Sequence, residues 1–138
     1  MTRIQLTIQD EVIVCELLTE VAPVTCEAIQ ALLPYEADLH YAKIAGEEIL
    51  FGVPLMLPLE HRQEVHGLPA GSVVYWPNRQ VFCLYYGAPQ EEAATVTVFA
   101  HVVGNLEGLR RVGEGVRLRQ GASVRVERMD EPATREGP

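Results

Sequence analysis

The sequence has few basic residues and no long apolar run. Eleven Lys and Arg residues stand against 19 Asp and Glu residues, which gives a net charge of −8 at pH 7. A protein that binds a phosphate backbone needs Lys and Arg to displace counterions, so this balance argues against a nucleic-acid partner. No apolar run approaches the roughly 18–20 residues that span a bilayer, which argues against a membrane partner.

Signal-peptide and disulfide patterns are also lacking. The first ten residues, MTRIQLTIQD, alternate between apolar and polar instead of forming the apolar core of a signal peptide. Three cysteines occur without CxxC spacing inside apolar stretches, where a buried thiol behaves as a small hydrophobe: Cys15, Cys26 and Cys83. We therefore expect a cytoplasmic protein with reduced cysteines.

Metal and cofactor motifs are missing as well. The four histidines show neither HxH nor HExxH spacing: His40, His61, His66 and His101. The glycine-containing segment 104–108, GNLEG, lacks the spacing of a phosphate-binding loop, a dinucleotide fingerprint or a nucleophile elbow. We expect no metal and no cofactor.

What is present is enough apolar material for a core. The chain has 138 residues, of which 48% are hydrophobic, and this length is typical of one compact unit. We expect a single domain over residues 1–128 and a flexible polar tail over residues 129–138.

Most of the chain has the pattern of β-structure. Apolar residues alternate with polar ones from Arg3 to Leu18 around a turn at residues 9–11, which predicts an N-terminal hairpin. Proline at position 23 and apolar residues at helical spacing predict one helix over 22–33. Further strands are expected at 37–44, 47–53, 72–76, 80–86 and 94–103.

The remaining segments are a long connection and a C-terminal region. Residues 54–71 contain three prolines and two glycines and are expected to form a loop over a groove. Asn105 and Gly113 predict the two ends of a second short helix, over 105–112. Residues 116–120 and 123–128 alternate again, which predicts a closing hairpin that turns at Gly121.

Charge is unevenly distributed. Residues 1–109 carry four basic and 14 acidic side chains, whereas residues 110–128 carry six arginines and two glutamates. These arginines could meet acidic residues of the same chain, acidic residues of a neighbouring subunit, or an anion; we expect one of the two pairings between side chains, and we expect a homo-oligomer.

Two blocks resemble the cyclophilin family. Residues 15–32, CELLTEVAPVTCEAIQAL, are similar to the pattern F-E-L-F-x-D-x-x-P-x-T-x-E-N-F-x-x-L without a gap. Residues 96–109, VTVFAHVVGNLEGL, look like the strand H-x-V-F-G-x-V-x-x-G and the helix that follows it. Between them, residues 71–83, GSVVYWPNRQVFC, look like a shortened form of the segment that ends S-Q-F-F-I.

The resemblance implies a mainly β (α+β) fold, a closed eight-stranded barrel with two helices that cap its ends. Three further phrases look more like small bacterial cyclophilin-like proteins of unknown function than like true isomerases: GEEILFGVP at 46–54, PAGSVVYWP at 69–77 and LYYG at 84–87.

The isomerase residues of the family are largely replaced. In cyclophilins an arginine within F-H-R, followed by F-x-x-Q-G-G, assists the rotation of the proline amide. Here Arg62 follows Glu60-His61, but the sequence after it is QEVHG. The groove histidine of the family falls on Val96, and its tryptophan has no counterpart at residues 90–92.

Three groove positions remain by resemblance, namely Trp76, Gln80 and Phe82. Two aromatic faces and an amide suit a small or planar ligand, and packing of both rings against the long connection is the alternative. Weaker candidates for catalytic groups are Arg62, His101 and His40, the histidines because their unperturbed pKa lies near 6.5. Glu47 and Glu48 are adjacent in a predicted strand, so one points inward or toward the groove and the other into solvent.

Three functions follow as hypotheses. The first is a cyclophilin-like protein that binds a small molecule or short peptide. The second is a divergent, weak prolyl isomerase that uses Arg62. The third is a structural module that forms oligomers through exposed aromatic residues.

Overall fold

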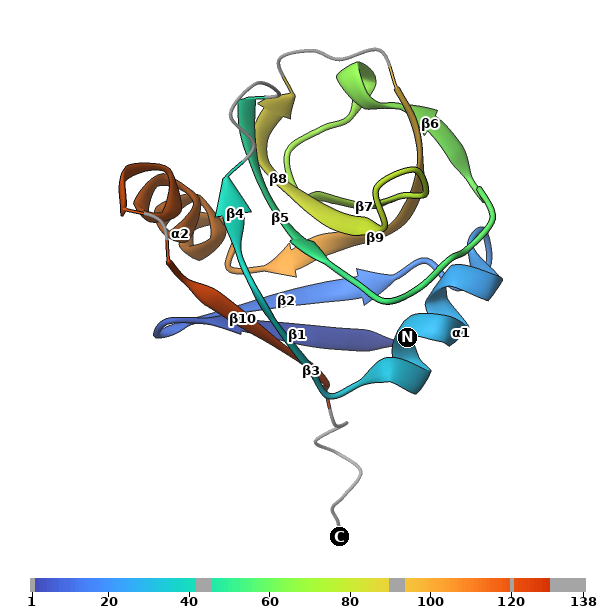
Figure 1. Ribbon diagram of the computed structural model, residues 1–138, viewed down its shortest axis with the longest axis horizontal. Coiled ribbons are helices and arrows are strands. Elements are labelled where there is room, and N and C mark those ends of the chain that lie inside the picture. Colours follow the sequence, from blue (N-terminus) through green and yellow to red (C-terminus); the bar gives the residue numbers. More distant parts are fainter. Residues whose placement is uncertain (1, 42–45, 90–93, 120, 130–138) are drawn as a thin grey trace, which may run out of the picture.

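The computed structural model describes residues 2–41, 46–89, 94–119 and 121–129. Of the predicted tail, residues 130–138 lie outside this part of the chain. The described residues form an antiparallel, nearly closed β-barrel with two α-helices, as the sequence predicted (Figure 1).

The elements follow one another along the chain in this order: β1 (Arg3–Ile8), β2 (Glu11–Leu17), α1 (Pro23–Leu32), β3 (Tyr35–Asp38), β4 (His40–Tyr41), β5 (Gly46–Gly52), β6 (Arg62–Glu64), the 3-10 turn η1 (Val65–Gly67), β7 (Ser72–Trp76), β8 (Val81–Pro89), β9 (Thr95–Gly104), α2 (Leu106–Arg119) and β10 (Ser123–Arg128).

The first hairpin shows why the barrel has an apolar interior. Ile4, Leu6 and Ile8 of β1 are at most 4% exposed, and the residues between them are more exposed. Side chains alternate between the two faces of a strand, so this spacing places all three in the interior. The predicted N-terminal hairpin is confirmed, with Leu6 opposite Ile13 in the ladder.

One interrupted strand closes the ring. The strand order is β3-β10-β1-β2-β9-β7-β8-β5-β4, with β6 attached to β9 outside this path. β3 pairs with β10, and β4 pairs with β5. Leu39 lies between β3 and β4 and belongs to neither ladder, and its N–H donates to the Ala122 carbonyl at 2.9 Å. Counting β3 and β4 as one strand leaves eight strands in the ring, the number that the resemblance implied, and β6 is a further strand outside it.

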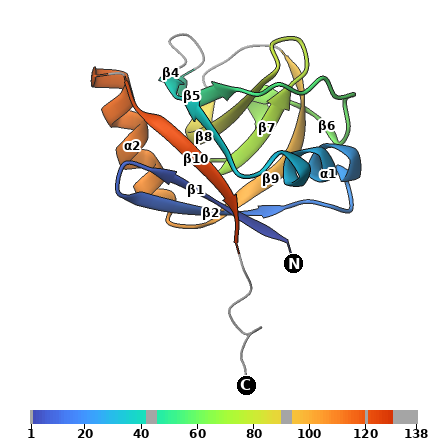
Figure 2. The ribbon, with the colours of Figure 1, turned by 60° about the horizontal axis from the view of Figure 1, so that its bottom comes forward.

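The two helices lie at opposite ends of the barrel (Figure 2). Cys26 and Ile29 of α1 and Leu109, Val112 and Val116 of α2 are buried in the same core as the inward residues of the strands. The helices therefore cover the interior at both ends.

The C-terminal prediction was wrong for residues 116–119. The second helix does not end at Gly113, and α2 continues to Arg119, so the closing hairpin does not form. The cause is burial, because Leu109, Val112 and Val116 recur at helical spacing and all three are at most 4% exposed. β10 instead pairs with β1 and β3.

The connection 54–71 is not a plain loop. It contains β6, which pairs with β9, and η1, which brings Val65 to 0% exposure. β6 extends the sheet beside β9, and η1 packs against β8 on the outer face of the sheet made by β5, β8, β7 and β9. Val65 and Leu68 belong there to a second group of buried apolar residues, here called the outer cluster: Val65, Leu68, Val74, Cys83, Tyr85, Val96 and Val98.

Candidate functional site

A hollow of about 550 Å³ opens beside the outer cluster. Its described lining comes from the connection before β6, from the end of β7 with the turn that follows, and from the start of β9: Leu59, Trp76, Pro77, Asn78, Arg79, Ala94 and Thr95. Four of these residues are apolar or aromatic and three are polar, so the hollow offers both a packing surface and hydrogen-bonding groups.

The turn after β7 sets the shape of this hollow. The N–H groups of Arg79 and Gln80 donate to the Trp76 carbonyl at 3.3 and 2.8 Å. Gln80 has φ +52°, in the left-handed region that a non-glycine residue enters only in tight turns. As a result the Arg79 guanidinium lies over the indole, with its carbon 4.9 Å from the ring centroid of Trp76.

Polar groups are buried behind Trp76. Glu48 is 2% exposed and lies opposite Tyr85 in the β5–β8 ladder, so both side chains point to the outer face. Within the part of the chain that is described, the Tyr85 hydroxyl and the Trp76 Nε1 atom are buried and make no hydrogen bond of good geometry. They nevertheless lie close enough to interact, and Tyr85 interacts with Glu48 as well.

Tyr85 stays protonated at neutral pH. Burial raises the pKa of its hydroxyl, and the charges of Cys83 and Glu48 raise it further. The site therefore has a phenol O–H and an indole N–H behind the hollow, two donors in an apolar setting.

The predicted ligand residues do not share one surface. Phe82 lies opposite Tyr75, and its ring packs in the interior against Phe51, Tyr75 and Phe99 at centroid distances of 5.6, 6.0 and 4.8 Å. Trp76 lies on the outer face.

The side chain of Gln80 points neither into the interior with Phe82 nor into the hollow with Trp76. Its side-chain Nε2 donates to the Leu55 carbonyl at 3.1 Å, and it lines a separate open depression together with His40. The structure thus brings Gln80 and His40 together and leaves Trp76 and Phe82 on opposite sides of the sheet.

The remaining catalytic candidates are exposed and lie outside the described lining of the hollow. Arg62 pairs with Thr97 at the start of β6. His101 lies in β9, between Glu16 of β2 and Ser72 of β7. Among the described residues, no group of three His, Cys, Asp or Glu side chains is placed to hold a metal ion.

Glu60 fixes the connection that runs past the hollow. Its carboxylate accepts from the N–H of Val24 at 3.0 Å and from the N–H and hydroxyl of Thr25 at 2.8 and 2.7 Å, at the start of α1. Burial opposes ionisation of Glu60, but these hydrogen bonds outweigh it and lower its pKa. The N–H of Glu60 donates to the Thr97 hydroxyl at 3.0 Å, which attaches the same segment to β9.

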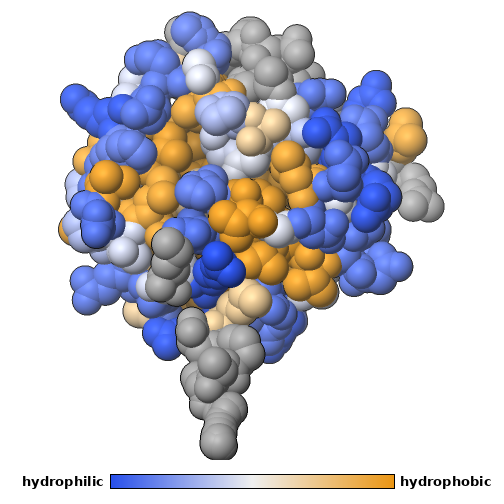
Figure 3. Space-filling model, turned by 180° about the vertical axis from the view of Figure 1, so that it is seen from behind, coloured by the Kyte–Doolittle hydropathy of each residue, from blue (hydrophilic) through white to orange (hydrophobic). Residues whose placement is uncertain are grey.

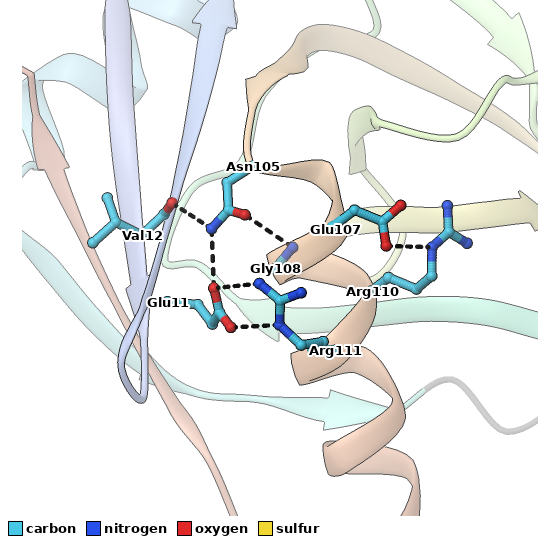
Figure 4. A network of polar contacts seen from close by, with 7 residues as sticks. All are labelled: Glu11, Val12, Asn105, Glu107, Gly108, Arg110 and Arg111. Carbon is cyan, nitrogen blue, oxygen red and sulfur yellow. Dashed lines mark hydrogen bonds and ion pairs between the residues drawn. The ribbon is translucent and has the colours of Figure 1, made fainter.

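The basic stretch forms ion pairs within the chain. Arg111 donates twice to Glu11, at 2.8 and 3.2 Å, and Asn105 joins the same carboxylate to the first turn of α2 (Figure 4). Arg125 pairs with Glu36 at 2.8 Å. Arg110 and Arg117 pair with glutamates three residues away on α2. These contacts support pairing within the chain, one of the two predicted possibilities.

Sequence reasoning missed Arg79 and Tyr85. Arg79 becomes part of a site only through the turn that stacks it on Trp76, and Tyr85 only through burial under η1. Alternation in the predicted strand did indicate that either Glu47 or Glu48 points inward, and Glu48 is the buried one.

Comparison with known proteins identifies the class to which this fold belongs. The profile of the cyclophilin-like family matches residues 2–127, so the chain belongs to the cyclophilin-like family. No curated protein matches it. No described helix is long and apolar enough to cross a membrane.

Two solved structures share the fold. McbB in complex with tryptophan superposes with a TM-score of 0.84 at 20% identity, over 93% of this chain and 45% of the McbB chain, so this chain spans less than half of that protein. The hypothetical protein AF2241 from Archaeoglobus fulgidus superposes with a TM-score of 0.70 at 27% identity, over 93% of this chain and 95% of that chain.

Proposed function

We propose that this protein binds a small molecule in the hollow beside Trp76. The observation that carries the proposal is the hollow itself, where one face of the site is an indole and the rim is formed by Asn78, Arg79 and Thr95. A volume of about 550 Å³ lies within the range of ligand sites in proteins. The buried donors of Trp76 and Tyr85 add polar groups behind an apolar wall.

The McbB structure supports a small molecule over a peptide as the ligand. That protein has the same fold and was solved with tryptophan, a molecule that a hollow of this size could hold. A short peptide in an open groove, the other ligand predicted from the sequence, is less well supported, because Phe82 is turned into the interior.

The single tryptophan makes this proposal testable. Small aromatic acids, amines and amides are titrated into the protein while Trp76 fluorescence is recorded, and calorimetry measures the affinity. Ala94→Phe fills the hollow and is expected to abolish binding, whereas Leu118→Phe adds the same ring at a 74% exposed position of α2 and serves as the control. Equal binding by wild type and Ala94→Phe would contradict the proposal.

Prolyl isomerase activity is not expected. Arg62 is exposed on a three-residue strand, and the family's groove histidine is replaced by Val96, which is buried in the outer cluster. A peptide assay with X-Pro substrates, with Arg62→Ala as the control, should show no acceleration. Turnover that disappears in Arg62→Ala would restore the isomerase hypothesis.

We further propose that the protein forms a homo-oligomer. The face seen in Figure 3 has apolar areas broken by polar side chains, which is the kind of surface that a subunit contact can use. Because several arginines already pair within the chain, we expect such a contact to depend on apolar area. The mass in solution, measured at low and high salt, should then be independent of salt.

A further inference from the structure

We propose that the ligand of the Trp76 hollow is an aromatic monocarboxylate held by Arg79, an inference that rests on the function proposed above. Among the described residues that line the hollow, Arg79 carries the one formal charge. The other lining groups are apolar or neutral. A guanidinium is the group best suited to bind a carboxylate, because its fork of N–H donors matches the two carboxylate oxygens.

Arg79 is positioned and still available. Its guanidinium lies over the ring of Trp76, which limits its freedom, and the residue is exposed, so its N–H groups are within reach of a ligand. Arg111 and Arg125, in contrast, direct their N–H groups to carboxylates of the chain at 2.8 Å. Arg79 has no ion pair with any described residue. A preorganised cation beside an aromatic face fits an anionic group attached to a planar body.

The surroundings favour one negative charge over two. The Thr95 hydroxyl at the rim donates to Glu64 at 3.1 Å, and Glu48 lies buried behind Tyr85. With a net charge of −8 on the whole chain, a phosphate dianion would meet more repulsion than a carboxylate. A single guanidinium among these groups therefore selects a monoanion.

The test uses four probes of similar size that differ in charge: phenylacetate, phenylacetamide, phenethylamine and phenylalanine. Inorganic phosphate is the fifth probe. Trp76 is the one tryptophan, so its indole N–H gives one cross peak in a ¹H–¹⁵N spectrum, and titration of that peak yields an affinity for each probe. Phenylacetate is expected to bind about tenfold more tightly than phenylacetamide, because the hydrogen bonds become charge-assisted.

Arg79→Gln is expected to reduce this preference to about twofold or less, and Arg128→Gln, which changes an exposed arginine of β10, should leave it intact. Equal binding of phenylacetate and phenylacetamide, or phosphate binding as tight as that of phenylacetate, would overturn the proposal that the ligand is a monocarboxylate. A response to phenethylamine alone would also overturn it while leaving the hollow as a binding site. If no probe moves the indole peak, and a wider panel of compounds gives none either, the proposed function itself fails.

Discussion

The barrel interior and the outer cluster lie on opposite faces of the same strands, and they differ in how well the hydroxyl groups of Tyr75 and Tyr85 are hydrogen-bonded. On the inward face of β7 and β8, Tyr75 donates its hydroxyl to the Leu55 carbonyl at 2.7 Å and accepts from the Leu57 N–H at 3.1 Å. On the outward face, Tyr85 and Trp76 bury polar atoms without such hydrogen bonds in the described chain. Burial of a polar atom without a well-formed hydrogen bond costs stability, and among the described residues the Tyr86 hydroxyl of the interior core shares this feature. The contrast therefore holds between Tyr75 and Tyr85 and not for every tyrosine of the two regions.

The largest expected difference between the two regions is in packing. Phe82→Ala removes a ring that touches three other aromatic rings in the interior and should lower the free energy of unfolding by about 3–5 kcal/mol. Leu68→Ala in the outer cluster should cost about 2 kcal/mol, because that region lies near the surface and can collapse. Urea unfolding of both variants measures this, and an equal loss would remove the distinction.

A glycine pair in α2 tests how tightly the interior is packed at that end. A Cβ atom on Gly113 would lie 2.3 Å from the ring of Tyr86, which is fully buried, whereas one on Gly115 meets nothing within 4 Å. We expect Gly113→Ala to destabilise by about 1–3 kcal/mol through overpacking. Gly115→Ala should stabilise by about 0.5–1 kcal/mol through helix propensity. Thermal unfolding distinguishes the two, and a gain in both would show that Tyr86 moves aside freely.

A tyrosine pair compares the hydroxyl groups directly. Tyr75→Phe leaves the Leu55 carbonyl and the Leu57 N–H without their partner and should cost about 1–2 kcal/mol. Tyr85→Phe removes a buried hydroxyl whose interactions with Trp76 and Glu48 are not well-formed hydrogen bonds, so the loss of stability should be smaller, below about 1 kcal/mol. If Tyr85→Phe costs as much as Tyr75→Phe in chemical denaturation, the outer cluster is as well satisfied as the interior.

The smallest expected effect concerns the segment that joins the two regions. Glu60→Gln weakens the cap on α1 and should cost at most about 1 kcal/mol near pH 7, because the carboxylate is close to solvent. The pKa of Glu60 is lowered from its ordinary value of 4.5, so its contribution is complete above that value and is lost as the pH falls toward the folded-state pKa. The difference between wild type and Glu60→Gln should therefore shrink below about pH 4.5. A difference that stays constant with pH would contradict the role of the charge.

The strand segments could be predicted because the period of two in β1 and the apolar runs of β7 to β9 are local signals. The closed barrel was implied instead by the resemblance of residues 15–32 and 96–109 to the cyclophilin family. The continuation of α2 through Gly113 was missed because a glycine after a helical pattern usually ends the helix. Here the ring of Tyr86, 27 positions earlier in the chain, occupies the space that a side chain would need.

The site was harder to predict because the alternation of side chains between the two faces of a strand does not continue through a turn. Trp76 and Phe82 are six positions apart, which would place them on one face of a continuous strand. The turn between them pairs Trp76 with Val81 and Tyr75 with Phe82, so the two aromatic rings point in opposite directions. Arg79 and Tyr85 likewise gain their roles from contacts made in three dimensions, which no local pattern indicates.

The divided strand that closes the ring has a consequence for motion. β3 offers four residues to β10 and β4 only two to β5, with Leu39 between them. Ladders this short open first in native-state fluctuations. Amide protons of β3 and β4 should therefore exchange with deuterium before those of β7 and β9. The barrel should open transiently where β3 pairs with β10 and β4 pairs with β5. Solvent would then enter the interior between the two helices while the ladders among β7, β8 and β9 stay paired.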